Sequence, residues 1–191
     1  MSDRDQLSPE DIRLGTSYEA VRGEVRRQVA ELKRHRRVTL GDRLELVFEN
    51  RETIRSAVEE LVRAEHVTDP EQIAADVDAF NAVIPKPGSL GAMLFMEVLD
   101  PADLTEAAVE LQGVAACLYI DIGGTRAAGV PEVVNPPDEA EPAVFVSFPL
   151  STEQRQAWKG GAEVVAGVEH PAATARVALA EEQRSAIAAE L

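Results

Sequence analysis

NAVIPKPGSLGAMLFMEVL, residues 81–99, is the stretch at which the sequence changes character. Pro85 and Pro87 cannot continue a helix, because proline lacks a backbone N–H and its ring clashes with the preceding turn. From Leu90 onward the pattern differs, and residues 93–99 form a nearly continuous apolar run that only Glu97 interrupts. Such a run predicts a central strand.

Helical periodicity dominates the chain before this stretch. It predicts a short helical segment that begins at Ser8-Pro9 and ends at Gly15, and longer helices over residues 17–36, 52–65 and 70–80. The longest of these is expected to start with a capping box formed by Thr16 and Glu19. Residues 38–48 predict extended structure that turns at Gly41-Asp42.

Strand-like patterns dominate the chain after this stretch. The expected strands are residues 93–99, 114–122, 125–134, 143–148, 162–169 and 174–179, and the expected helices are residues 100–111, 151–159 and 181–191. Residues 135–142 predict a loop. Helices followed by strands favour an α+β fold, with N-terminal helices packed on a mostly antiparallel sheet of roughly five to seven strands from the C-terminal two thirds. We expect a single domain over residues 1–191, helix-rich to residue 89 and strand-rich from residue 90.

The charge of the chain limits its partners. Residues 1–66 carry 13 Lys/Arg and 14 Asp/Glu (-1), and residues 67–191 carry 6 and 20 (-14), which together give the net charge of -15. So acidic a body repels nucleic acid and anionic membranes, and we expect neither as a partner.

The composition predicts a cytoplasmic protein. Hydrophobic residues make up 45% of the 191 residues, which is globular usage. No apolar run approaches the roughly 18 residues that span a bilayer, and the polar, acidic residues 1–11 do not resemble a signal peptide. The single cysteine, Cys117, suits a reducing compartment and is expected to be a small buried hydrophobe.

The predicted helix over residues 17–36 carries an apolar seam beside a basic flank. The seam consists of Tyr18, Val21, Val25, Val29 and Leu32, and it should be buried by the core or by a second subunit in a homodimer. The flank includes four candidate partner-docking residues, Arg26, Arg27, Arg34 and Arg37. Two interpretations stay open for the flank: pairing with the acidic remainder of the chain, or docking of an acidic protein or a phosphate-bearing ligand.

A polar cluster follows the extended segment at residues 48–53, FENRET. Asn50 is explained as a helix cap, but Glu49 and Arg51 are not needed for capping. An arginine beside helix-start amides suits a carboxylate or phosphate, so Glu49, Asn50, Arg51, Glu60 and Arg63 are candidate ligand- or anion-binding residues. Structural ion pairs are the alternative account of the same residues.

Glu97 is the sixth candidate, because a carboxylate inside an apolar strand must be paired, hydrogen-bonded or protonated. We expect an arginine (Arg51, Arg55 or Arg63) or a bound cation in contact with it. Glu97 and His170 are also the weak candidates for a metal site, since carboxylate oxygens suit hard or ferrous ions. The sequence requires no cofactor, and it contains none of the common nucleotide-binding, zinc or hydrolase motifs that would identify catalytic residues.

Several short runs together resemble a known family. They are RVTLG (37–41), FENRET (48–53), Glu60 with RAE (63–65), DAFNAVIP (78–85), Glu97 after an apolar strand, and His170-Pro171. This pattern is similar to the bacterial family catalogued as domain of unknown function 3501, over nearly the whole chain. Ala57 and Met93 stand where the family pattern leads us to expect Gln and Thr, so a site that uses those side chains is altered here.

The resemblance implies a cytosolic bacterial protein encoded near rubrerythrin-like and iron–sulfur oxidoreductase genes. It therefore favours a non-enzymatic accessory protein, linked to iron, redox or oxidative-stress metabolism, that docks on such a partner. The alternative is a small enzyme or a metal- or anion-binding protein with a carboxylate–arginine pocket. Convergence of Glu49, Arg51, Glu60 and Glu97 on one pocket would favour the alternative.

Overall fold

The structure, a computed structural model, describes residues 6–97, 104–132 and 143–191. Its helices are η1 (Pro9–Asp11), α1 (Gly15–Arg34), α2 (Arg51–Ala64), α3 (Pro70–Asn81), α4 (Leu104–Glu110), η3 (Val114–Cys117), α5 (Thr152–Lys159) and α6 (Glu181–Ala188). Its strands are β1 (Arg37–Leu40), β2 (Leu44–Glu49), β3 (Ser89–Met96), β4 (Leu118–Ile122), β5 (Thr125–Ala128), β6 (Val130–Glu132), β7 (Ala143–Pro149), β8 (Val164–His170) and β9 (Ala173–Ala178). The fold is α+β, as predicted.

The strands form two antiparallel sheets rather than the one that the sequence predicts. The five-stranded sheet has the order β1-β2-β3-β7-β6, and the four-stranded sheet has the order β5-β4-β8-β9. The expected strand over residues 125–134 breaks at Gly129, where the chain passes from one sheet to the other. A side chain at Gly129 would lie 2.9 Å from Val146 Cγ1, so the crossing is close-packed.

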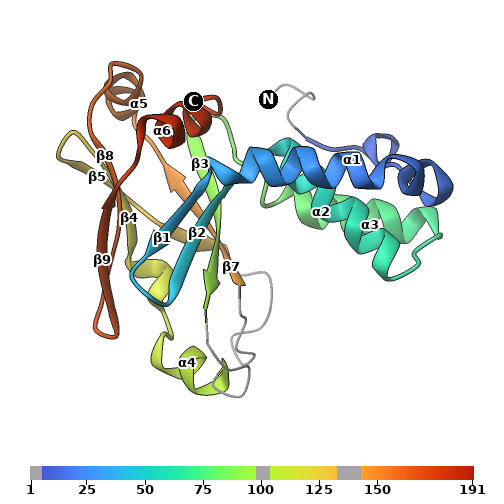
Figure 1. Ribbon diagram of the computed structural model, residues 1–191, viewed down its shortest axis with the longest axis horizontal. Helices are drawn as coiled ribbons and strands as arrows, with labels where there is room; N and C mark the ends of the chain where they lie inside the picture. The colour runs from blue at the N-terminus through green and yellow to red at the C-terminus, as the bar shows by residue number, and fades with distance from the viewer. Residues whose placement is uncertain (1–5, 98–103, 133–142) are drawn as a thin grey trace.

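Two separate apolar clusters hold the fold together. The larger fills the space between the sheets, with Leu46, Phe48 and Ile120 among its fully buried members. The smaller joins Leu7 and Ile12, which flank η1, to α2, α3 and Phe145 on β7. Neither cluster contains a residue of α1, which lies along α2 at the side of the molecule away from the sheets (Figure 1).

The apolar seam of α1 is only partly buried. Tyr18 and Val25 are buried, Val29 and Leu32 are half-buried, and Val21 is 38% exposed. The helix is therefore attached to the rest of the molecule with little apolar contact, and the seam prediction is confirmed only for Tyr18 and Val25.

Four local predictions need correction or fall outside the described residues. α1 begins at Gly15 with Leu14 as N-cap, so the expected capping box at Thr16 and Glu19 is wrong. β3 ends at Met96, and its strand character begins earlier than expected, at Ser89. The first residues of the helix predicted over residues 100–111 and the predicted loop at 135–142 lie outside the described residues.

Gly167 on β8 gives a test of packing on the outer face of the smaller sheet. A Cβ at Gly167 would lie 2.2 Å from Tyr119 Cζ. The guanidinium carbon of Arg126 lies 4.0 Å from the centroid of the same tyrosine ring, so the ring has a neighbour on its face. Gly167→Ala should therefore cost about 1–3 kcal/mol of unfolding free energy through overpacking, measured by urea denaturation. Gly23→Ala, in open space on α1, is the control and should stabilise by roughly 0.5–1 kcal/mol. Equal stability of the wild type and Gly167→Ala would contradict this packing.

Candidate functional site

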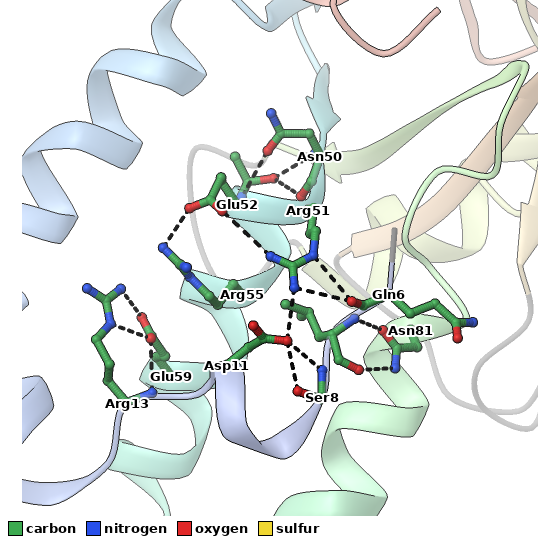
Figure 2. Close-up of polar contacts among 12 residues, drawn as sticks. Gln6, Ser8, Asp11, Arg13, Asn50, Arg51, Glu52, Arg55, Glu59 and Asn81 are labelled. Carbon is green, nitrogen blue, oxygen red and sulfur yellow. Dashed lines mark hydrogen bonds and ion pairs between the residues drawn. The ribbon is translucent and has the colours of Figure 1, made fainter. Parts of the chain in front are cut away.

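Glu59 on α2 fastens the segment that precedes α1. Its carboxylate is fully buried and accepts hydrogen bonds from Arg13 Nε (2.7 Å), Arg13 Nη2 (2.9 Å) and the backbone N–H of Arg13 (3.2 Å). Figure 2 shows the two-pronged contact between the side chains. Because both oxygens are engaged, the carboxylate is committed to holding the chain in place.

Glu60, the next residue, fastens α1 itself. It accepts hydrogen bonds from Arg22 Nε (2.8 Å), Arg22 Nη2 (3.0 Å) and the Tyr18 hydroxyl (2.8 Å). The hydrogen bond from Arg22 holds the pKa of Glu60 below its ordinary value. Burial, followed by the bond to Glu60, raises the pKa of Tyr18 to about 12.

Arg63 and His66 lie at the C-terminal end of α2. Arg63 Nε donates to Glu19 of α1 at 2.5 Å, in a pair whose side chains are 38% and 53% exposed. His66 ends the helix in the left-handed region, with φ 54°, and its N–H donates to the carbonyl of Arg63. A residue other than glycine in this conformation is strained, and such positions cluster at binding sites.

A cavity of about 600 Å³ lies where the start of α1 meets the end of α2. Leu14, Val62 and Val67 supply apolar walls, and the polar lining includes Arg13, Glu19, Glu59, Arg63 and His66. The ion pairs of Glu59, Glu60 and Glu19 set the distance between the two helices, so they also shape this cavity.

Figure 2 shows the polar contacts of Asn50, Arg51 and Glu52, which belong to the FENRET cluster. Asn50 caps α2 by accepting from the backbone N–H of Thr53 at 3.0 Å. Arg51 donates to the carbonyl of Gln6 (3.2 Å) and to Asp11 Oδ2 (2.9 Å), and so ties the start of the chain to α2. Arg51 also lines a smaller cavity of about 290 Å³, beside Lys86 and Glu190.

A second buried polar cluster joins α6 to the sheet. Arg36 is 2% exposed and donates to the carbonyl of Ala186 (2.7 Å) and to Glu190 (2.5 Å), which also accepts from Asn50 (3.3 Å). Glu49 is buried and pairs with Lys33 of α1 at 2.8 Å. Arg36 Nε and Nη1 and Glu49 Oε2 are buried without a hydrogen-bond partner among the described residues, so these pairs satisfy the buried charges only in part.

The expected environment of Glu97 is wrong. Glu97 is exposed and stands one residue beyond β3, where its backbone N–H donates to the carbonyl of Arg43. The three arginines expected beside it are engaged elsewhere: Arg51 with Asp11, Arg55 with Glu52, and Arg63 with Glu19. The apolar run misled the prediction because the strand ends before the carboxylate.

The four residues proposed to share a pocket do not converge. Glu49, Arg51 and Glu60 each face a different partner, and Glu97 lies at the end of β3. Of the six candidates, only Arg63 lines the larger cavity. His170 is held locally, because its Nδ1 accepts from Ala172 N–H and its Nε2 lies 3.2 Å from the carbonyl of Gln112.

The basic flank is largely paired, but with glutamates close to it in the sequence and not with the acidic remainder of the chain that the first interpretation names. Arg27 and Arg34 pair with Glu24 and Glu31 on the same helix, and Arg37 pairs with Glu45 at 2.9 Å. The side chains of Arg27 and Arg34 remain 75% and 68% exposed. Exposed ion pairs of this kind contribute little to the stability of the fold, so another charged group can replace either partner.

Sequence reasoning missed Arg13 and His66. Arg13 stands 46 residues from Glu59, so no local pattern connects them. His66 carried a weak signal: it occupies the place after a helix end where glycine is common, and a bulky residue there suggests a requirement for its side chain. In residues 6–97, 104–132 and 143–191, no three His, Cys, Asp or Glu side chains gather around a metal-sized site. None of the helices described is long and apolar enough to cross a membrane.

Comparisons with known proteins reveal the fold but no activity. A family model described as "Protein of unknown function (DUF3501)" matches residues 6–191. A crystal structure of a novel protein of unknown function from Burkholderia pseudomallei K96243 is similar over 100% of this chain and 98% of that one, with a TM-score of 0.86 and 22% identity. At that identity the likeness concerns the fold alone. A comparison with curated proteins gives no match.

Replacing Glu60 tests how α1 is held. Because the folded-state pKa of Glu60 is depressed, its contribution is present above the ordinary value of 4.5 and is lost as the pH falls through the folded pKa. Glu60→Gln should cost about 2 kcal/mol near neutral pH, since two charge-assisted partners are weakened. The difference in unfolding free energy between Glu60→Gln and the wild type should become smaller as the pH falls from neutral to below 4.5. Urea denaturation at a series of pH values measures this difference. A difference that does not change with pH would contradict the assignment.

Proposed function

We propose that this chain, which belongs to the DUF3501 family, is a non-enzymatic binding protein whose ligand occupies the cavity between α1 and α2. The observation that carries the proposal is the cavity itself, whose lining combines apolar side chains with a few polar groups. Its volume of about 600 Å³ falls within the range of roughly 300–1,000 Å³ that small-molecule sites occupy.

The engagement of the acidic groups supports binding rather than catalysis. A general acid or base needs a group free to exchange a proton with the substrate. Glu59 is surrounded by three donors from Arg13, and Glu19 accepts from Arg63. These carboxylates position the helices, whereas the apolar walls and the remaining N–H groups are available to a ligand.

A cavity-filling variant tests this proposal. Ala64 lines the cavity, so Ala64→Phe should occupy part of it. Ala57 is exposed on the same helix and is not among the lining residues, which makes Ala57→Phe the matched control. We expect ligand-observed NMR of a small-fragment library to yield hits that Ala64→Phe loses and Ala57→Phe retains. A library without hits, or hits that both variants retain, would refute the cavity as the ligand site.

A second role, docking on a protein partner, is favoured by the outward arginines of α1. Arg27 and Arg34 have exposed side chains in weak pairs, and Arg26 is exposed beside them. We propose an acidic partner for this face. The family resemblance suggests an iron–sulfur oxidoreductase or a rubrerythrin-like protein, which would make the chain an accessory to redox metabolism.

Charge reversal tests the docking role. The variant Arg26→Glu/Arg27→Glu/Arg34→Glu should weaken association with such a partner and reduce its dependence on salt, because steering by opposite charges is lost. Arg176→Glu, on the four-stranded sheet, is the control and should bind as wild type does. Surface plasmon resonance at low and high salt measures both. Unchanged affinity of the triple variant would exclude this face.

A further inference from the structure

We infer that the ligand of the α1–α2 cavity is a small organic carboxylate with an apolar body. The inference rests on the proposed function and deepens it. It follows from the hydrogen-bonding groups that the ion pairs leave over, and from the side chains that form the rest of the wall.

The charged groups left over in the cavity are guanidinium N–H donors. Arg63 uses Nε for Glu19, and its two Nη groups form no hydrogen bond with a residue that the structure describes. Arg13 uses Nε and Nη2 for Glu59, which leaves Nη1. Both side chains line the cavity. A ligand that fits must therefore offer acceptors.

The two carboxylates of the cavity are already engaged. Both oxygens of Glu59 receive hydrogen bonds from Arg13, and one oxygen of Glu19 receives a hydrogen bond from Arg63. The free guanidinium N–H groups therefore favour a ligand that brings an anionic acceptor of its own. A carboxylate presents two coplanar acceptors, which match the two parallel N–H groups of an arginine fork.

A ligand carboxylate can replace the Glu19 carboxylate as the partner of Arg63. Its side chains are 38% and 53% exposed, so the pair contributes little to stability. A carboxylate that enters the cavity can bind the same guanidinium through a charge-assisted hydrogen bond. Glu19 thus competes with the ligand for Arg63.

The walls of the cavity require an apolar body on the ligand. Leu14, which is 39% exposed, lines the cavity with Val62 and Val67. Inorganic anions would leave these walls in contact with water. Covering them adds the hydrophobic contribution that makes a carboxylate with a hydrocarbon body the better ligand.

Isothermal titration calorimetry with 3-phenylpropionate, 3-phenylpropanamide, acetate and inorganic phosphate tests the inference. The two phenyl compounds share their body and differ in the charged end, whereas acetate and phosphate lack the body. We expect 3-phenylpropionate to bind at least about tenfold more tightly than the other three compounds. A factor of this size corresponds to the free energy that one charge-assisted hydrogen bond contributes.

Three variants locate the interaction. Arg63→Gln should weaken the binding of 3-phenylpropionate by about tenfold or more. Glu19→Gln should tighten this binding, because the carboxylate that competes for Arg63 is removed. Arg55→Gln is the control: Arg55 lies on the same helix, pairs with Glu52 and does not line the cavity. Circular dichroism confirms that each variant is folded. Glu19→Gln keeps the test decisive if Arg63→Gln unfolds.

The outcomes separate the class of ligand from the existence of the site. Equal binding of the acid and the amide, or an affinity that neither Arg63→Gln nor Glu19→Gln changes, would overturn the carboxylate inference. Phosphate binding as tightly as 3-phenylpropionate would overturn it in favour of a phosphate-bearing ligand. If none of the four compounds binds, the inference fails, and the fragment library with Ala64→Phe still decides whether the cavity is a ligand site.

Discussion

Two neighbouring carboxylates on α2, Glu59 and Glu60, hold the first helix of the chain in place. Glu59 accepts hydrogen bonds from the main chain and side chain of Arg13, and Glu60 accepts hydrogen bonds from Tyr18 and Arg22. α1 contributes no residue to either apolar cluster and buries only Tyr18 and Val25, so these contacts supply much of its attachment. The cavity beside them exists because they set one helix against the other.

Attachment by ion pairs makes α1 the element best suited to movement. Regions with few buried apolar contacts open at lower free energy than the core, and ligand sites are commonly built from them. The sheets, in contrast, share a continuous apolar core and form a rigid base. The molecule thus combines a fixed sandwich of sheets with a helix held by contacts that a ligand or partner can replace.

The sequence predicted the elements well and the site poorly, for separate physical reasons. The helices α2 and α3 follow from caps and apolar spacing within a few residues, and their predicted bounds lie within one residue of those observed. The chain passes between the two sheets at Gly129, where a Cβ would lie only 2.9 Å from Val146 Cγ1. The sequence around Gly129 does not reveal this close contact, because Val146 is distant along the chain. Residue types indicated that charges must be paired, but the pairs join segments about 40 residues apart, which local patterns do not specify.

Amide chemical-shift mapping tests the central claim, that ligands enter between α1 and α2, most directly. Titration of 3-phenylpropionate into ¹⁵N-labelled protein should shift the amides of residues 13–19 and 59–68 in a saturable manner, because these two segments line the cavity. Shifts concentrated at residues 84–87 and 189–190, around the smaller cavity, or scattered over the surface without saturation would contradict the account.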